Sequence, residues 1–270
     1  MKKRRGFTPP VPPKRSRRFI GTSRSLAAIV LLTAFLAPCS FASDVHWSYS
    51  GEAGPENWEN LSPAFGEAVG DAQSPIDITT ENRANGVEFY YNDGAFSVLN
   101  NGHTLQATPA GREENWIVVD GVRFYLQQLH FHTPSEHTLN GSHSPMEIHF
   151  VHNGGGRTTV VGLFVDEGPE NEALAAAWSA APRGSGEIGK IEKPFLLTSL
   201  LPENLSGIRY VGSLTTPPTT EGVSWIILEE HSSASAAQIR FFTNLIGENA
   251  RPTQPLNGRT LAPFQGRSGR

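Results

Sequence analysis

Short hydrophobic runs that alternate with polar residues dominate the chain from residue 86 onward. Such alternation has a period of two and is typical of β-strands with one buried face. Turn-forming pairs separate several runs, and Asp120-Gly121 is a strong hairpin signal. The runs are VEFYY (87–91), FSVLNNGHTLQAT (96–108), NWIVV (115–119), VRFYLQQLHFH (122–132), PMEIHFVH (145–152), TTVVGLFVD (158–166) and VSWIILEE (223–230). We therefore expect a mainly β fold with antiparallel neighbours.

Helical patterns are confined to short segments. The best candidate is 170–180 (ENEALAAAWSA), which is rich in good helix formers. The 27 glycines and 20 prolines also suit a loop-rich β protein better than a helical bundle. A chain of 270 residues without internal repeats forms one large domain or two small ones.

Three histidines lie in two of the runs at a spacing that suits a metal site. His130 and His132 are two residues apart, and side chains two apart in a strand point to the same face. His149 lies in the next run and can converge with them if the two strands pair side by side. Three neutral imidazoles without a fourth protein ligand are typical of a catalytic zinc site, in which one position stays open for water.

Polar neighbours strengthen this interpretation. Gln128 precedes His130 by two residues, and Glu147 precedes His149 by two, so each shares a face with its histidine. Metal-bound histidines usually donate their other ring proton to a carboxylate, amide or carbonyl, which fixes the orientation of the ring. The alternative is a set of unrelated histidines on a half-polar strand face.

Three further histidines are interpreted one by one. His143 lies in the connecting loop and His152 is out of phase with His149, so both are expected at the surface. His103 follows the turn at Asn101-Gly102 and is expected to be partly exposed. It is either an ordinary loop histidine or a proton carrier, since an exposed imidazole titrates near neutral pH.

A rigid loop, GSLTTPP (212–218), offers two hydroxyls that could face the site. A threonine hydroxyl both donates and accepts hydrogen bonds. Thr215 could accept the proton of a metal-bound hydroxide if it donates its own proton to a carboxylate, for which Glu136 is the nearest candidate. Taken alone, the loop is better interpreted as an ordinary turn.

The first 42 residues are predicted to be a cleaved export signal. They contain nine basic residues and no acid, and the apolar run 26–37 is too short for a comfortable membrane span. Ser40-Phe41-Ala42 offers a small-x-small cleavage site, so the mature domain would be 43–270. A periplasmic or secreted location follows, without a stable membrane anchor.

The route of export stays open. Residues 16–20 (SRRFI) resemble a twin-arginine signal, but the general secretory route fits as well. A lipid anchor on Cys39 is disfavoured because Pro38 occupies a position where a small residue is expected.

Removal of the signal would change the charge balance. The mature chain would keep 13 basic and 26 acidic residues, a formal net charge of −13. Such a charge argues against nucleic acid as a partner. The only cysteine, Cys39, would leave with the signal, so neither a disulfide nor a thiolate metal site is available in the mature chain.

The motifs together resemble those of the α-class carbonic anhydrases, and FHTPSEH resembles the bacterial form. QSPIDI, QLHFHTPSEHT, MEIHFVH, GSLTTPP and RPTQPLNGR occur in the order and approximate spacing of that family. The resemblance runs from about Trp47 to Pro263. It implies a single domain with a large twisted, mostly antiparallel open sheet, short peripheral helices and zinc in a central conical cleft.

The resemblance also implies roles for individual residues. Zn²⁺ would be held by His130, His132 and His149, which would be oriented by Gln128, the backbone carbonyl of Asn249, and Glu147. His103, Glu136 and Thr215 would be catalytic. Polar residues around a water chain would be Tyr49, Asn101 and Gln106, and the carbon dioxide pocket would comprise Val151, Val160, Leu214, Thr216, Val223 and Trp225.

The implied activity is reversible hydration of carbon dioxide to bicarbonate and a proton. It would proceed through a zinc-bound hydroxide with His103 as proton shuttle, and weak esterase activity would accompany it. A homodimer is left open. Two departures from the family stand out: Thr219 occupies the position of a cysteine found in many bacterial members, and Ala250 replaces a frequent large aromatic.

Two other classes of function compete with this one. A zinc hydrolase acting on a larger substrate would usually carry a His-Glu-x-x-His motif, which the sequence lacks. A non-enzymatic zinc-binding or adhesion protein of the same fold would have no need of Thr215, Glu136 or His103.

Overall fold

The computed structural model describes residues 45–78 and 86–269. The export signal predicted for 1–42 and its cleavage site lie outside the described residues. Within those two ranges, no helix is both long enough and apolar enough to cross a membrane.

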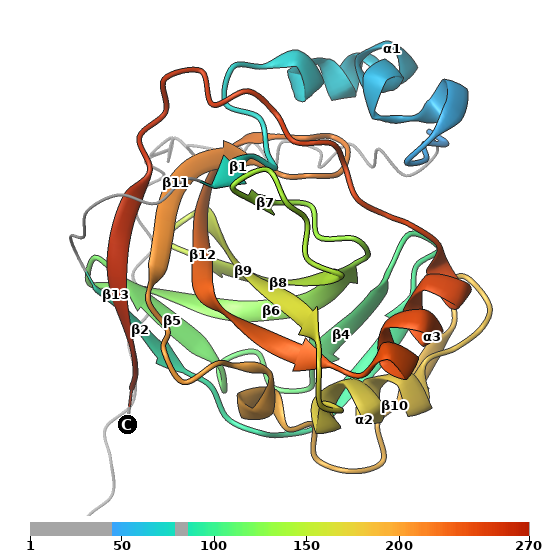
Figure 1. Ribbon diagram of the computed structural model, residues 1–270, viewed down its shortest axis with the longest axis vertical. Helices are drawn as coiled ribbons and strands as arrows, with labels where there is room; N and C mark the ends of the chain where they lie inside the picture. The colour runs from blue at the N-terminus through green and yellow to red at the C-terminus, as the bar shows by residue number, and fades with distance from the viewer. Residues whose placement is uncertain (1–44, 79–85, 270) are drawn as a thin grey trace, which may run out of the picture. The chain divides into compact units, whose positions relative to one another are not determined.

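Strands account for most of the regular structure in the described ranges (Figure 1). The strands are β1 (Asp77–Ile78), β2 (Gly86–Tyr90), β3 (Phe96–Asn100), β4 (Leu105–Pro109), β5 (Trp116–Val119), β6 (Val122–His132), β7 (Thr138–Leu139), β8 (Met146–Gly154), β9 (Arg157–Glu167), β10 (Ile188–Lys190), β11 (Gly207–Ser213), β12 (Glu221–Ala234) and β13 (Ala262–Ser268). The α-helices are α1 (Trp58–Leu61), α2 (Glu172–Ala180) and α3 (Ala236–Ile246), and the short 3₁₀ helices are Gly51–Ala53, Pro55–Asn57, Pro63–Val69 and Leu197–Leu200.

The main sheet has 11 strands in the order β10-β3-β4-β6-β5-β2-β13-β11-β12-β9-β8, and β6 also pairs with β8. The ladder therefore returns to β6, which lies beside β8 in Figure 1. Neighbours are antiparallel except in the pairs β12–β9 and β13–β2. The prediction of a mainly β, mostly antiparallel fold is confirmed.

Local signals located several elements correctly. Asp120 and Gly121 form the β5–β6 turn with φ values of 51° and 77°, the left-handed geometry that a tight two-residue hairpin requires. The helix expected at 170–180 is α2, where the Asn171 side chain caps the N–H groups of Ala173 and Leu174. Strands β11 and β13 and helix α3 were not expected from the sequence.

A bulge in β6 determines which of its residues face the metal site. The pairing with β8 shifts register between Leu126 and Gln128, so the chain has one extra residue there. Leu126 and Leu129 consequently both point into the main core, although they are three residues apart. Beyond the bulge Gln128, His130 and His132 share the opposite face.

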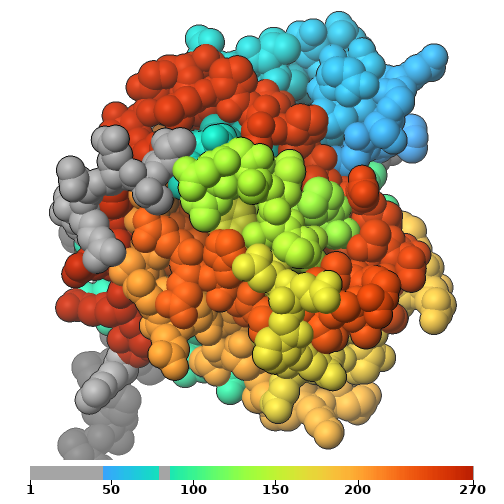
Figure 2. Space-filling model, in the orientation of Figure 1, coloured from blue at the N-terminus to red at the C-terminus, as the bar shows by residue number. Residues whose placement is uncertain are grey.

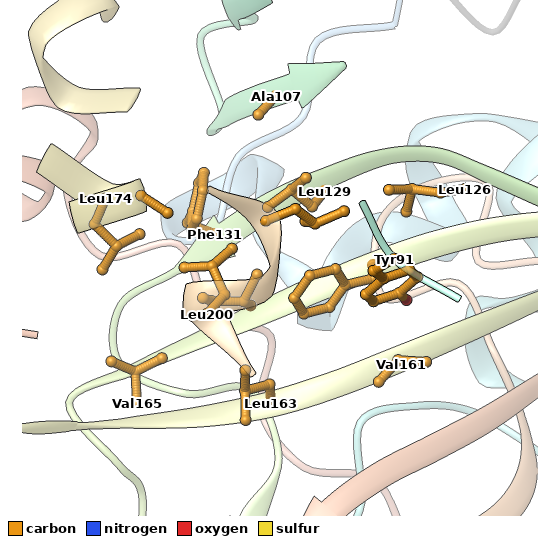
Figure 3. Close-up of a cluster of buried hydrophobic side chains, with 14 of the residues drawn as sticks. Tyr91, Ala107, Leu126, Leu129, Phe131, Val161, Leu163, Val165, Leu174 and Leu200 are labelled. Atoms are coloured by element: carbon orange, nitrogen blue, oxygen red, sulfur yellow. The ribbon is translucent and has the colours of Figure 1, made fainter. Parts of the chain in front are cut away.

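The two faces of the sheet bury different clusters. Figure 3 shows part of the larger cluster, in which Leu129 and Phe131 of β6 and Leu163 and Val165 of β9 join Leu174 of α2. The smaller cluster centres on Trp225 of β12, whose side chain is 1% exposed. Full burial of one such large apolar side chain contributes about 1.5–3 kcal/mol, so the larger cluster supplies most of the stability.

The prediction that His152 lies at the surface is wrong, whereas His143 is exposed as expected. The face of β8 that carries His152 packs into the main core, together with Ile148 and Phe150. The imidazole Nε2 lies 2.7 Å from the hydroxyl of Tyr91, and the two rings are stacked. Burial lowers the pKa of His152 to about 3.

This burial predicts a stability loss in mild acid. The pKa of His152 is lower in the folded chain than the ~6.5 of an unfolded chain, so the unfolded state binds the proton first as the pH falls. The free energy of unfolding should therefore decrease below pH 6.5 by about 1.4 kcal/mol per pH unit from this residue. His152→Gln should reduce the difference in unfolding free energy between pH 7 and pH 5 by about 2 kcal/mol in urea titrations. The exposed control His143→Gln should keep the wild-type difference, and an equal difference in all three proteins would contradict the prediction.

Candidate metal centre

Within the described ranges, each of the three predicted ligands forms a hydrogen bond through one ring nitrogen only. His130 Nδ1 lies 2.9 Å from Gln128 Oε1, and His132 Nδ1 lies 2.8 Å from the backbone carbonyl oxygen of Asn249. Because amide and backbone oxygens accept, both Nδ1 atoms donate and both Nε2 lone pairs are free. Burial, together with the nearby histidines, holds the pKa of His130 well below its usual value, and burial also lowers that of His132.

His149 is held by a carboxylate in the reverse orientation. Its Nε2 donates to Glu147 Oε1 over 2.7 Å, which leaves Nδ1 free. Burial would raise the pKa of Glu147, but the imidazoles of His137 and His149 hold it well below its usual value. Burial would likewise lower the pKa of His149, yet the adjacent Glu147 carboxylate keeps it raised. The two groups thus form a charge-assisted hydrogen bond in the protein interior.

The strand register brings the three rings together. His130 and His149 are direct partners in the β6–β8 ladder, and His132 pairs with Glu147. The ligand atoms of His130, His132 and His149 all lie within 4.8 Å of one another. The Nε2 atom of His132 is buried and has no hydrogen-bond partner in the described ranges, an arrangement that costs free energy unless a ligand satisfies it. These residues fit a divalent metal that prefers imidazole nitrogen.

Glu136 lies beside the point where the histidines converge. Its Oε1 accepts the backbone N–H of Arg251 over 2.9 Å. Its Oε2 is 3.6 Å from His132 Nε2 and 3.8 Å from His149 Nδ1, and it has no hydrogen-bond partner among the described residues. Thr215 is buried at 5% exposure, but no hydrogen bond joins it to Glu136 in this part of the chain. Oε2 of Glu136 is therefore a buried acceptor that remains available for a further hydrogen bond.

A buried polar chain extends from Glu147, and sequence analysis did not find it. Glu147 also accepts His137 Nδ1 and the His137 backbone N–H, both over 2.8 Å. His137 Nε2 lies 2.7 Å from the hydroxyl of Tyr210, which lies 2.8 Å from Ser74 Oγ. These residues come from separate parts of the sequence, and no regular spacing relates all four of them.

The N-terminal arm, residues 45–74, is connected to the site through Arg251. The buried guanidinium of Arg251 donates to Gln73 Oε1, the Ser74 carbonyl and the Ala68 carbonyl, and it lies over the Trp58 ring. Figure 2 shows the arm, in blue, against the C-terminal segment, in red.

The loop that carries Thr215 is held without a disulfide. Thr219 is buried, and its carbonyl accepts a hydrogen bond from Gln73 Nε2 over 3.2 Å. Ser213 and Ser74 exchange two further hydrogen bonds of 2.9 and 3.1 Å. These contacts join the loop to the segment around Gln73 and Ser74.

Apolar residues pack beside His149. Val160, Val223 and Trp225 belong to the smaller buried cluster, and Val151 and Leu214 pack against it. The Trp225 ring is edge-on to the His149 ring, with centroids 4.8 Å apart. Thr216, at the end of the Thr215 loop, is half-buried.

His103 is half-buried, and its ring stacks on Trp47 with centroids 3.8 Å apart. Burial, and to a lesser extent the nearby His46, lower its pKa. Asn101 Oδ1 accepts the backbone N–H of His103 over 2.9 Å, and Asn249 Nδ2 donates to the His103 carbonyl over 3.0 Å. Asn249 thereby fixes both a predicted ligand and the predicted shuttle segment.

Three comparisons with known proteins bear on this fold and site. The family model of the eukaryotic-type carbonic anhydrases matches residues 53–265. A carbonic anhydrase of Neisseria gonorrhoeae is 40% identical over 252 residues, covering 90% of this chain and 98% of that protein. The structure of the α-carbonic anhydrase of Thermovibrio ammonificans superposes with a TM-score of 0.76 at 44% identity, covering 82% of this chain and 99% of that one. A hyperthermostable carbonic anhydrase from a hydrothermal vent chimney gives a TM-score of 0.77 at 40% identity, covering 82% of this chain and 100% of that one.

The mainly β sheet with three convergent imidazoles defines the class of molecule as one built to hold a metal on the face of a sheet. The match of the family model to most of the chain then identifies the family. This chain belongs to the eukaryotic-type carbonic anhydrase family of enzymes.

The role of Glu147 predicts how a variant should bind metal. In Glu147→Gln, the side chain would have one acceptor oxygen and an NH₂ group where three donors now converge. We expect Zn²⁺ affinity, measured by competition with a chromogenic chelator, to fall by about 10–100-fold. Glu167→Gln, an exposed change in β9, is the control and should bind as wild type. Unfolding by urea shows whether Glu147→Gln remains folded, and wild-type affinity in a folded Glu147→Gln protein would refute the role.

Proposed function

We propose that this chain catalyses the reversible hydration of carbon dioxide to bicarbonate and a proton, with zinc as its cofactor. The observation that carries the proposal is the convergence of three imidazoles, each with its other ring nitrogen hydrogen-bonded. His130 and His132 would hold the metal through Nε2 and His149 through Nδ1. Zinc on neutral ligands supplies a hydroxide nucleophile near neutral pH, because it lowers the pKa of bound water to about 7.

The protein groups around the histidines bind and orient the reactants. Carbon dioxide is apolar, so it suits the surface formed by Val151, Val160, Leu214, Val223 and Trp225 beside His149. Thr215 would accept a hydrogen bond from the attacking hydroxide and donate one to Oε2 of Glu136. These two hydrogen bonds would aim a lone pair of the hydroxide oxygen at carbon dioxide. Thr216 lies next to this pair and contributes a second hydroxyl.

Turnover also requires that the product proton reach solvent. His103 is half-buried, and histidine is the side chain that most readily takes up and releases a proton near neutral pH. Its position next to the Asn249 side chain, which also holds the segment of His132, favours it as the shuttle.

Two further features belong to the proposal. The same nucleophile would hydrolyse small activated esters slowly. The basic and apolar composition of 1–42 supports export to the periplasm or the medium. Small molecules are then the only partners that the activity requires.

Stopped-flow measurement of carbon dioxide hydration tests the proposed function. The protein from Ser43 should be active with one equivalent of Zn²⁺, inactive after the metal is removed by chelation, and active again when Zn²⁺ is restored. Thr215→Val should reduce kcat/KM by about 100-fold while stoichiometric Zn²⁺ binding is kept, because the nucleophile is no longer oriented. Stoichiometric zinc without hydration would move the protein to the class of non-enzymatic zinc-binding proteins.

The proposed shuttle predicts a buffer-dependent defect. His103→Ala should slow turnover at low buffer concentration by about 10-fold or more, because the proton then leaves without a relay group. Added imidazole should restore the rate, whereas kcat/KM at high buffer should stay near wild type. His231→Ala, a change on β12 at a histidine outside the predicted site, serves as the control. Unchanged turnover of His103→Ala at low buffer would contradict the shuttle role.

A further inference from the structure

A cleft of about 200 Å³ lies on the sheet face opposite the three predicted metal ligands. Its lining includes Val211, Ser224 and Thr159, which are consecutive register partners across β11, β12 and β9. Arg209 and Arg157 also line it, each two residues before one of these partners and thus on the same face. Val211 is 57% exposed, so this part of the face is open.

The charge of the cleft is unusual for this protein. Only 13 basic residues follow residue 42, against 26 acidic residues, yet two arginines meet here with a single acid, Asp120. Arg209 forms a two-bond ion pair with that acid, with distances of 3.0 and 2.7 Å. Its charge is therefore already matched.

Arg157 supplies an unmatched positive charge. Its guanidinium forms neither a salt bridge nor a hydrogen bond within the described ranges, and it lies 5.6 Å from the centre of the Phe124 ring. Arg157 also helps to lower the pKa of Asp120, after the larger contribution of Arg209, which places its charge close to the ion pair. The cleft thus has a net charge of about +1 and an arginine with all its donors available.

A buried hydroxyl in the lining also lacks a partner. Thr159 is 0% exposed, and its Oγ1 forms no hydrogen bond with the described part of the protein. Buried polar atoms are nearly always satisfied, so the unpaired hydroxyl, which is on the same strand face as Arg157, indicates that a further partner completes the set. Both groups donate hydrogen bonds.

We propose that this cleft binds a small oxyanion, of the size of bicarbonate or phosphate. A guanidinium presents parallel N–H donors that match two oxygens of such an anion, and the Thr159 hydroxyl would donate to the third. Thr159 is adjacent to Val160, and Ser224 lies between Val223 and Trp225, so the anion site and the apolar surface next to His149 use opposite faces of the same strands. The anion site needs no metal.

Titration with inorganic phosphate, and separately with bicarbonate, tests this proposal on ¹⁵N-labelled, zinc-loaded protein. The backbone amides of Gly222 and Ser224 and the Nε–H of Arg157 should shift in a saturable manner with one or both anions. The anion that saturates at the lower concentration is the better ligand. Arg157→Gln should weaken that binding by about tenfold or more, because a charge-assisted hydrogen bond is lost.

Arg123→Gln is the matched control, since Arg123 is also exposed and lies on the β5–β6 hairpin but outside the cleft. It should bind within about twofold of wild type, because its guanidinium lies over the Trp116 and Tyr125 rings and does not line the cleft. Thr159→Val, which keeps the shape of the side chain, should also weaken binding. Shifts that do not saturate with either anion, or equal affinities in Arg157→Gln and wild type, would overturn the proposal. Binding at the histidines is distinguished because it would be unaffected by Arg157→Gln.

Discussion

The buried carboxylate of Glu147 is the interaction on which the site depends. It accepts hydrogen bonds from two imidazoles and one backbone N–H, and it has no exposure to solvent. A buried carboxylate that loses its partners is strongly destabilising, so the rings of His137 and His149 cannot easily turn away. The charge-assisted hydrogen bond from His149 Nε2 to this carboxylate therefore determines where His149 Nδ1 points. The same carboxylate fixes His137, whose Nε2 contacts the Tyr210 hydroxyl. That hydroxyl in turn contacts the side chain of Ser74, shortly before β1.

The second constraint is register. Because His130 opposes His149 and His132 opposes Glu147, a slip of one residue between β6 and β8 would send one ligand set into the apolar core. The bulge between Leu126 and Gln128 is part of this arrangement. If the strand kept all its residues but alternated regularly from Leu126, the histidines would lie on the face of the larger apolar cluster. The two adjacent glutamines mark the position where the chain changes phase.

The sequence predicted the site best where the geometry is local. Gln128 and His130, like Glu147 and His149, are related by the two-residue period of a strand, and their hydrogen bonds follow from it. Strand pairing then required only that neighbouring strands be adjacent in space. The carbonyl of Asn249 could be assigned only through the family resemblance, since 117 residues separate it from His132. No periodicity relates residues that distant.

The misses have the same physical origin. Strands β11 and β13 hold Gly, Pro and charged residues in place of clear alternation, and their pairing within the sheet stabilises them. Tertiary contacts determine their conformation. His152 was assigned to the surface because it is out of phase with His149. That phase argument was correct, but in this sheet the face opposite the histidines is also covered.

A sheet covered on both faces explains how one set of strands carries several kinds of chemistry. Odd positions of β8 supply Glu147, His149 and Val151 to the metal side, while even positions such as Phe150 pack into the main core. The core side is rigid because it is close-packed, and rigid strands keep ligand atoms within reach of one another before any metal binds. Polar groups on the metal side need no flexibility to find their partners. The stability of the larger cluster thus offsets the free energy that burial of the polar groups on the metal side costs.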